Sequence, residues 1–129
     1  MTEEENDNTV DPVADLHERR RRIREEMGGV DRVARMRAEG TPTIRDHIAG
    51  VLDSDSFREL GTHGRSMRLE DRHNTPGDGK VGGEGRVDGR PVAIGGDDIT
   101  VKKGSSAIVG GRRIHRIYER ALERGMPYV

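Results

Sequence analysis

In the first half of the chain, apolar residues recur at helical spacing along three short segments. The first helix is expected over residues 12–27, because Asp11 can accept hydrogen bonds from free N–H groups and Pro12 has no N–H to leave unpaired. A second helix is expected over 30–39. The third helix begins at Thr41 or Thr43, and its apolar positions are Ile44, Ile48, Val51 and Leu52.

In the second half, short extended segments alternate with turn residues. A strand over 81–87 is followed by Asp-Gly at 88–89, a strong hairpin signal because both turn positions need positive φ. The return strand covers 91–94, and the polar run at 95–98 is expected to interrupt it. A last extended piece is predicted at 99–101.

A long amphipathic helix is expected over 106–124, with Gly125 as its C-terminal cap. Residues 126–129 begin a further extended segment, although three or four residues scarcely make a strand. The positions assigned to the apolar face of the helix are Ala107, Gly110, Gly111, Ile114, Ile117, Tyr118, Ala121 and Leu122. The polar face contains Arg112, Arg113, Arg116, Glu119, Arg120, Glu123 and Arg124.

The order of elements predicts an α+β chain in which the helices come first. Residues 1–10 are acidic and amide-rich and are expected to form a disordered tail, and 11–60 form a helical segment. Residues 61–76 are expected to form a long loop, followed by the hairpin and helix of 77–129. The loop is polar, and its basic residues include His63, Arg65, Arg68, Arg72 and His73.

Composition limits the core and the kinds of partner. Hydrophobic residues make up 30% of the chain and aromatic residues 2%, so only a small core can form, whereas 36% of residues are charged. The net charge of −1 favours neither nucleic acid nor a membrane surface as a partner. The basic run Arg19–Arg22 sits between acidic residues, which indicates a solvated helix face with ion pairs. The absence of cysteine and of an apolar leader fits a cytoplasmic protein.

The strongest candidate chemistry lies where the last helix begins. A loop with two Lys, a Gly and two Ser at a helix N-terminus can bind phosphate through N–H donors and positive charge. The competing interpretation is that a Ser only caps the helix and the lysines are solvated. No His pairs with another His or a carboxylate at metal-ligand spacing, apart from a weak match at Asp71 and His73, so no metal site is predicted. The candidate residues are Lys102, Lys103, Gly104, Ser105 and Ser106, with Arg112 and Arg113 as further phosphate contacts.

Several segments, taken in order, resemble motifs of one enzyme family. Residues 76–81 (PGDGKV) are similar to its PGDGVV, and 85–92 (GRVDGRPV) to its GYGTVDGRPV. Residues 43–60 resemble the family segment that contains TARERI, LLD and SF-EL. Residues 98–101 (DITV) resemble its QDFTV, and residues 125–129 (GMPYV) resemble its GAPVI. This family is the carboxyltransferase (beta) subunit of biotin-dependent acyl-CoA carboxylases, of the propionyl-CoA carboxylase and methylmalonyl-CoA decarboxylase type.

The resemblance covers nearly all of residues 13–129 and implies the truncated start of a crotonase-like domain, a superhelix of ββα units. By this resemblance the complete subunit transfers CO2 from carboxybiotin, carried on a partner protein, to an acyl-CoA. The implied partners are a biotin carboxylase or biotin carrier subunit and the remaining carboxyltransferase chain or further copies. In the family the loop before the last helix lies near CoA, so the phosphate candidates become CoA-binding candidates.

The sequence also departs from the family pattern. Residues 63–69 agree poorly with the family, and the Gly-Gly loop expected to form an oxyanion hole would follow residue 129. We therefore assign no catalytic residue and expect the chain alone to be inactive. Two alternatives stay open: a non-catalytic chain that docks with another polypeptide, and a small helical interaction protein.

Overall fold

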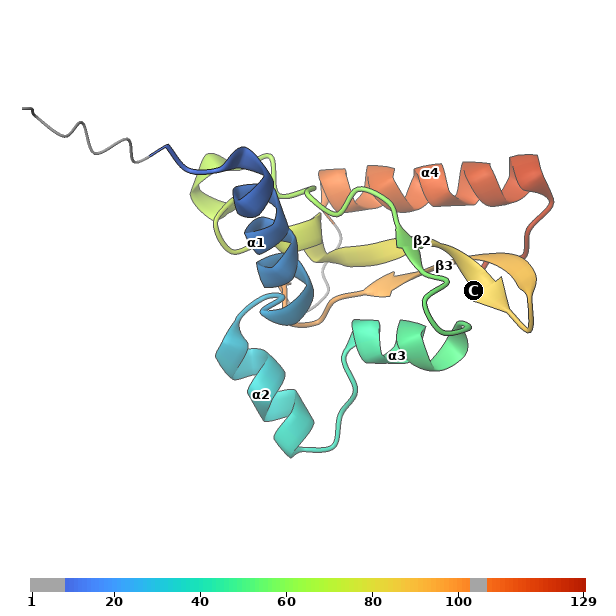
Figure 1. Ribbon diagram of the computed structural model, residues 1–129, viewed down its shortest axis with the longest axis horizontal. Coiled ribbons are helices and arrows are strands. Elements are labelled where there is room, and N and C mark those ends of the chain that lie inside the picture. The colour runs from blue at the N-terminus through green and yellow to red at the C-terminus, as the bar shows by residue number, and fades with distance from the viewer. Residues whose placement is uncertain (1–8, 103–106) are drawn as a thin grey trace, which may run out of the picture.

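The computed structural model describes residues 9–102 and 107–129, in which helices surround a small antiparallel sheet (Figure 1). The expected α+β class is confirmed. None of the described helices has the length and apolar character needed to cross a membrane. The elements are α1 (Pro12–Glu25), α2 (Val30–Ala38), α3 (Ile44–Val51), β1 (Arg58–Glu59), the 3-10 turns η1 (Leu69–Asp71) and η2 (Pro76–Gly79), β2 (Lys80–Val87), β3 (Arg90–Asp97) and α4 (Ile108–Arg124).

The predicted hairpin is present as strands β2 and β3. Asp88 (φ 49°) and Gly89 (φ 76°) form its turn in the left-handed conformation that the sequence predicts. The Asp53 carboxylate accepts hydrogen bonds from the N–H groups of both turn residues, at 2.9 and 2.8 Å. Asp53, two residues beyond the end of α3, therefore holds the hairpin tip in place.

Strand β3 is longer than predicted, because Gly95 and Gly96 do not interrupt it. Residue 95 lies opposite Gly82, residue 96 lies opposite Val81, and the ladder ends only at Asp97. The missing side chains make room for neighbours: a Cβ on Gly96 would lie 2.3 Å from Cδ1 of Ile44 in α3. The glycines thus allow a helix to pack closely against the sheet. The prediction that the return strand ends before them was wrong.

Two other local predictions were wrong. Strand β1 was missed, because two residues that pair with Glu84 and Gly83 carry no periodic signal of their own. The extended piece expected at 99–101 is a turn, because the Asp98 carboxylate accepts a hydrogen bond from the Thr100 N–H at 2.9 Å. Thr100 then accepts a hydrogen bond from the Gly28 N–H at 2.9 Å, which connects this turn to the junction between α1 and α2.

The sheet lies between two helices, with α3 on one face and α4 on the other (Figure 1). The cluster on the α3 side contains Ile48, Leu52, Val81, Val92 and Ile94, with Ile44, Phe57 and Val87 packed around it. The cluster on the α4 side contains Ala93, Ile117 and Ala121, with Leu60, Ile114, Met126 and Tyr128 packed around it. Each cluster is small, as the composition predicts.

The chain returns to the sheet after α4. Ala93 of β3 and Tyr128 form a parallel bridge, and the Gly95 N–H donates to the Val129 carbonyl at 3.1 Å. Residues 126–129 therefore run parallel to β3, which is the arrangement expected when two parallel strands are connected by a helix.

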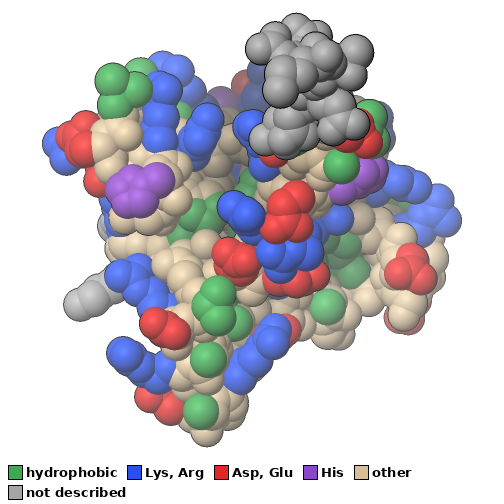
Figure 2. Space-filling model, turned by 60° about the vertical axis from the view of Figure 1, so that its left-hand side comes forward, with side chains coloured by type: hydrophobic (Ala, Val, Ile, Leu, Met, Phe, Trp, Pro, Cys, Tyr) green, Lys and Arg blue, Asp and Glu red, His purple; other side chains and the backbone are tan. Residues whose placement is uncertain are grey.

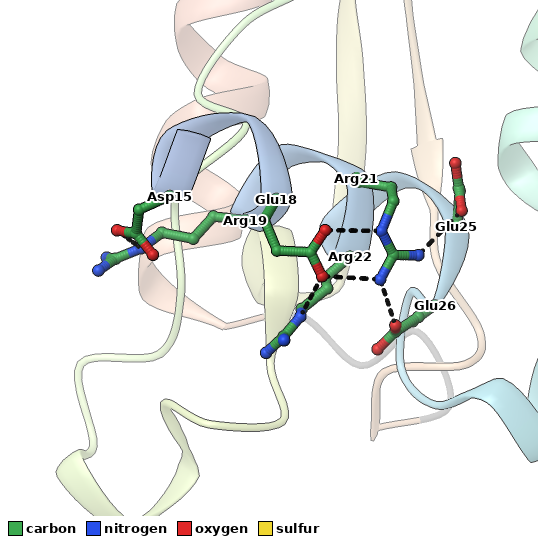
Figure 3. Close-up of polar contacts among 7 residues, drawn as sticks. All are labelled: Asp15, Glu18, Arg19, Arg21, Arg22, Glu25 and Glu26. Carbon is green, nitrogen blue, oxygen red and sulfur yellow. Dashed lines mark hydrogen bonds and ion pairs between the residues drawn. The ribbon is translucent and has the colours of Figure 1, made fainter. Parts of the chain in front are cut away.

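Helix α1 lies at the surface, and none of its residues is buried. Asp11 caps it through the Val13 N–H at 3.0 Å, as predicted. Its arginines form the expected ion pairs with acidic residues one turn away (Figure 3), and Figure 2 shows basic and acidic side chains mixed on the face that carries α1. The interpretation of this run as a solvated, ion-paired helix face is confirmed.

Arg113 was wrongly placed on the polar face of the last helix, because its side chain is only 6% exposed. Its Nη2 donates to the Glu59 carboxylate at 2.9 Å and its Nη1 to the Lys80 carbonyl at 2.7 Å, and its Nε bonds to the Leu60 carbonyl. The Glu59 carboxylate, only 3% exposed, is also held by both terminal nitrogens of Arg45, at 2.9 and 3.0 Å. This buried cluster joins α3, β1, β2 and α4.

The 3-10 turn η2 positions the start of α4. One carboxylate oxygen of the buried Asp78 accepts hydrogen bonds from the N–H groups of Val109 and Gly110, at 3.0 and 3.1 Å. Asp78 has φ 50°, a conformation that Asp adopts more readily than most residues. A Cβ on Gly110 would lie 2.5 Å from the Asp78 carbonyl oxygen, so the helix approaches this turn closely.

We expect the stability of the fold to depend on pH through Glu59. Burial by itself would raise the pKa of this carboxyl, but the hydrogen bonds and charges of Arg45 and Arg113 outweigh burial and lower it. The ionised carboxylate therefore stabilises the fold above the unfolded-state pKa of about 4.3, and this contribution is lost as pH falls through the lower folded-state pKa.

Glu59→Gln should therefore lower the free energy of unfolding by about 3–5 kcal/mol near neutral pH, because it leaves buried arginine charge unpaired. The difference from the unaltered chain should shrink as pH falls below the unfolded-state pKa of about 4.3 and through the lower folded-state pKa, where Glu59 itself becomes protonated. Urea unfolding followed by circular dichroism at several pH values measures the loss of stability and its dependence on pH. The exposed Glu39→Gln is the matched control, and a difference that stays constant with pH would contradict the role of ionised Glu59.

The Asp78 cap predicts a second effect on stability. Asp78→Ala should lower the free energy of unfolding by about 1–3 kcal/mol, because it removes the oxygen that accepts from both α4 N–H groups and places Ala at positive φ. Asp78→Asn keeps an acceptor oxygen and tolerates this conformation, so its loss should be smaller. Equal stability of the Ala variant and the unaltered chain in urea would exclude the capping role.

Candidate functional site

The residues predicted to bind phosphate do not form one cluster in the structure. Lys103, Gly104, Ser105 and Ser106 lie outside the described residues. Lys102 is exposed, and its Nζ pairs with the Asp71 carboxylate at 2.8 Å. It borders an open hollow of about 510 Å³ that also contains Arg32 and Arg35 of α2. The CoA-binding assignment of this loop stays a prediction.

At the start of α4, three of the N–H groups that could bind an anion already have a protein partner. Those of Val109 and Gly110 donate to Asp78, and that of Gly111 donates to the Ala107 carbonyl at 2.8 Å. The carboxylate thus takes the position that a phosphate prefers at a helix N-terminus. An anion at this end of α4 would meet negative charge.

Arg112 and Arg113, the two arginines predicted to contact phosphate, lie in different environments. Arg113 is buried and its guanidinium donates to three protein groups, as described above. Arg112 is exposed beside Gly111, His115 and Arg116, around an open hollow of about 450 Å³. A Cβ on Gly111 would meet no atom within 4 Å, so this glycine faces open space, unlike the neighbouring Gly110.

A groove of about 600 Å³ runs between the end of the hairpin, α4 and the last extended segment. The Lys80 side chain is mostly buried and pairs with Asp97 on its rim. Burial raises the pKa of the Tyr128 hydroxyl to about 12, with smaller contributions from Tyr118 and Asp97. A Cβ on Gly95 would lie 2.7 Å from that hydroxyl, so the glycine leaves room for it. The groove therefore offers a neutral phenol, an ion pair and a surface of glycine backbone.

A second hollow, of about 380 Å³, lies between α1 and the loop of 61–76, and the sequence did not predict it. Its rim is rich in basic side chains that come from two separate segments of the chain. The clue in the sequence was the basic character of 61–76, but nothing in the sequence indicated that this loop faces α1. The lining residues are Arg19, Arg22, Ile23, Glu26, Met27, His63, Gly64, Arg65, Arg72, His73 and Pro76.

Metal binding was not predicted, and in the part of the chain that the structure describes no three His, Cys, Asp or Glu side chains are grouped to hold an ion.

Residues 35–129 match the family described as the carboxyl transferase domain. The chain is 38% identical over 124 residues to the biotin-dependent acetyl-/propionyl-coenzyme A carboxylase beta5 subunit of Mycobacterium tuberculosis, covering 94% of this chain and 22% of that protein. It is 36% identical over 105 residues to the propionyl-CoA carboxylase carboxyltransferase subunit of Haloferax mediterranei, covering 79% and 20%. The chain thus spans about a fifth of the length of these relatives.

Solved structures have the same fold. The transcarboxylase 12S structure, a hexamer with hydrolysed methylmalonyl-coenzyme A bound, superposes with a TM-score of 0.82 at 33% identity, covering 90% of this chain and 23% of that one. A single-chain, multi-domain long-chain acyl-CoA carboxylase gives a TM-score of 0.84 at 25% identity, covering 93% and 13%. The expected crotonase-like architecture of a partial unit is confirmed by these carboxyltransferases. The chain belongs to the carboxyl transferase domain family.

Proposed function

We propose that this chain forms the N-terminal part of the carboxyltransferase subunit of a biotin-dependent acyl-CoA carboxylase. The complete subunit moves a carboxyl group between biotin and the α-carbon of an acyl-CoA. The observation that carries the proposal is the family match over 35–129, which includes the whole hairpin and α4 unit.

The biotin is a second substrate in this proposal, carried by a biotin carrier or biotin carboxylase subunit. The relative from Mycobacterium tuberculosis is named as one subunit of a biotin-dependent carboxylase, and transcarboxylase 12S is a hexamer within a multienzyme core. These names support a multi-subunit assembly that includes a biotin-carrying partner and further copies of the carboxyltransferase chain.

The described residues supply a scaffold in this proposal. Carboxyl transfer passes through the enolate of the thioester, whose oxygen needs fixed N–H donors. The glycine pairs of the hairpin do not qualify, because Gly82, Gly83, Gly95 and Gly96 take part in the sheet ladder with side chains or backbone packed against them. The hairpin and α4 instead fix the geometry on which the rest of the subunit is built.

The predicted boundaries between the helical segment (11–60), the loop (61–76) and the hairpin unit (77–129) stay a prediction. The packing of Ile48 and Leu52 of α3 against Val81 and Ile94 supports treating the helical segment and the hairpin as one folding unit.

A chimera tests the proposal. Residues 35–129 would replace the matching segment of the propionyl-CoA carboxylase carboxyltransferase subunit of Haloferax mediterranei, purified with its partner subunits. We expect carboxylation of propionyl-CoA to continue within about tenfold of the parent rate, because a correctly packed scaffold preserves the geometry of the reacting groups. The measurement is incorporation of labelled bicarbonate into acid-stable product.

The matched control is the same chimera with Glu59→Gln, which should lose activity together with thermal stability. A chimera that assembles to the parent size in gel filtration, melts as the parent does and forms no product would contradict the proposed function.

A further inference from the structure

The outer side of α4 exposes several large apolar side chains. The helix lies along one side of the molecule, and its inner side packs against the hairpin (Figure 1). On the outer side, Ile108, Tyr118 and Leu122 are 61%, 48% and 85% exposed. A patch of exposed apolar side chains on one element is typical of a protein–protein contact.

The exposed positions of α4 follow the spacing of a coiled-coil seam. Residues 108, 111, 115, 118 and 122 are separated by alternating steps of three and four, and all five are exposed. The buried residues Gly110, Arg113, Ile117 and Ala121 lie on the inner side. Positions at this alternating spacing form a narrow stripe along which two helices can pack. We call residues 108, 111, 115, 118 and 122 the outer seam.

The outer seam has a recess at Gly111 and a protruding side chain at Leu122. A Cβ built on Gly111 would meet no atom within 4 Å. The same glycine borders both the hollow of about 450 Å³ beside Arg112 and the groove of about 600 Å³ that contains Tyr118. Leu122 lies eleven positions further along the helix and extends into solvent. A second helix that offered a large side chain at Gly111 and a small one at Leu122 would fit this surface.

A second copy of α4, running antiparallel, meets this requirement. A two-fold axis between residues 116 and 117 places Leu122 of each copy over Gly111 of the other, so that the contact is made twice. The same axis places His115 of each copy opposite Tyr118 of the other. A parallel pair would instead place Leu122 against Leu122 and leave the two recesses facing one another.

Charged side chains beside the outer seam favour the same antiparallel arrangement. Arg112 and Arg116 lie along one flank in the N-terminal half of α4, and both are exposed. Glu119 and Glu123 follow on the same flank in the C-terminal half and are also exposed, with Glu119 beside His115 at 3.2 Å. An antiparallel pair brings this flank of the two copies together, so the arginines of one copy face the glutamates of the other.

We propose that the outer seam pairs two copies of this chain in a two-fold symmetric, antiparallel contact, with Leu122 of each copy in the recess at Gly111 of the other. One 17-residue helix from each copy forms the contact. Stable interfaces bury roughly 1,200–2,000 Å², and a single pair of short helices lies at the small end, so we expect a weak dimer. The pairing is independent of the proposed function, because it uses no group that takes part in carboxyl transfer.

Sedimentation equilibrium of the 129-residue chain between about 5 and 500 μM tests the pairing, since weak interfaces have Kd values in this range. We expect the mean mass to rise with concentration from the 14.3 kDa of one chain toward twice that value. Leu122→Ala should raise the dimer Kd at least about tenfold, because it removes the protruding side chain. Gly111→Leu should raise it similarly, because it fills the recess. Leu69→Ala, at a 75% exposed leucine of η1, is the matched control and should leave Kd unchanged.

Both seam positions are exposed in the single chain, so Leu122→Ala and Gly111→Leu should retain the circular dichroism spectrum and melting of the unaltered chain. Charge reversal gives a second readout that does not depend on truncating a side chain. Arg112→Glu with Arg116→Glu, and separately Glu119→Arg with Glu123→Arg, should each weaken self-association, because like charges then face one another. Mixing the two double variants should restore the dimer.

Cross-linking tests the antiparallel orientation. The chain contains no cysteine, so single cysteines can be introduced without competing thiols. A mixture of Gly111→Cys and Leu122→Cys chains should form a mixed disulfide faster than either chain forms one with itself, because only an antiparallel pair brings the two positions within bonding distance. Faster disulfide formation between two Leu122→Cys chains would overturn the antiparallel arrangement.

A mean mass that stays at one chain up to about 500 μM would overturn the pairing. A dimer whose Kd is unchanged by both Leu122→Ala and Gly111→Leu would also overturn it, because the contact would then lie elsewhere. If a monomeric chain bound the separately produced remainder of the Haloferax mediterranei subunit, and Leu122→Ala weakened that complex, the outer seam would belong to a contact within one subunit. The activity of the chimera does not depend on any of these results, so a failure of the pairing and a failure of the proposed function are distinguishable.

Discussion

The rest of the structure depends on the buried contact between Glu59 and two arginines. Glu59 lies on a two-residue strand, and Arg45 and Arg113 reach it from helices on opposite faces of the sheet. Arg113 also donates to carbonyls at Leu60 and Lys80, so one guanidinium satisfies groups of β2 and of the chain beside it. Such a cluster is costly to bury and more costly to break, because removing one partner leaves charge in the interior.

The cluster matters because the hydrophobic core is thin. Two small groups of aliphatic side chains cover the two faces of one short sheet, and the chain has a single Phe and no Trp. Glycines in the hairpin let the helices approach closely, as at Gly82, where a Cβ would lie 2.7 Å from Ile117. Close approach of backbone and aliphatic groups compensates for the lack of large side chains.

The packing of the elements also determines which basic side chains and N–H groups can reach a ligand. The end of α4 that would attract an anion is capped by Asp78, and Arg113 of the same helix is turned inward to Glu59. Accessible basic side chains of α1, α2 and the 61–76 loop border two hollows. The helices that border these hollows precede the hairpin in the chain, whereas Thr100 and Lys102, which border the second hollow, follow it.

The sequence by itself determined the helices, the hairpin and the family. Helical periodicity with Asp11 and Thr43 as caps, and the Asp-Gly turn, are local signals that depend on neighbouring residues only. Tertiary structure decided the rest: β1 exists because β2 offers a pairing edge, and the polar residue Arg113 is buried because Glu59 lies opposite it. The hollow between α1 and the loop of 61–76 arises because two segments far apart in sequence fold side by side, and no local pattern records that contact. Long-range pairing of charge and of strand edges is a property of the packed chain, which is why periodicity and propensity could not predict it.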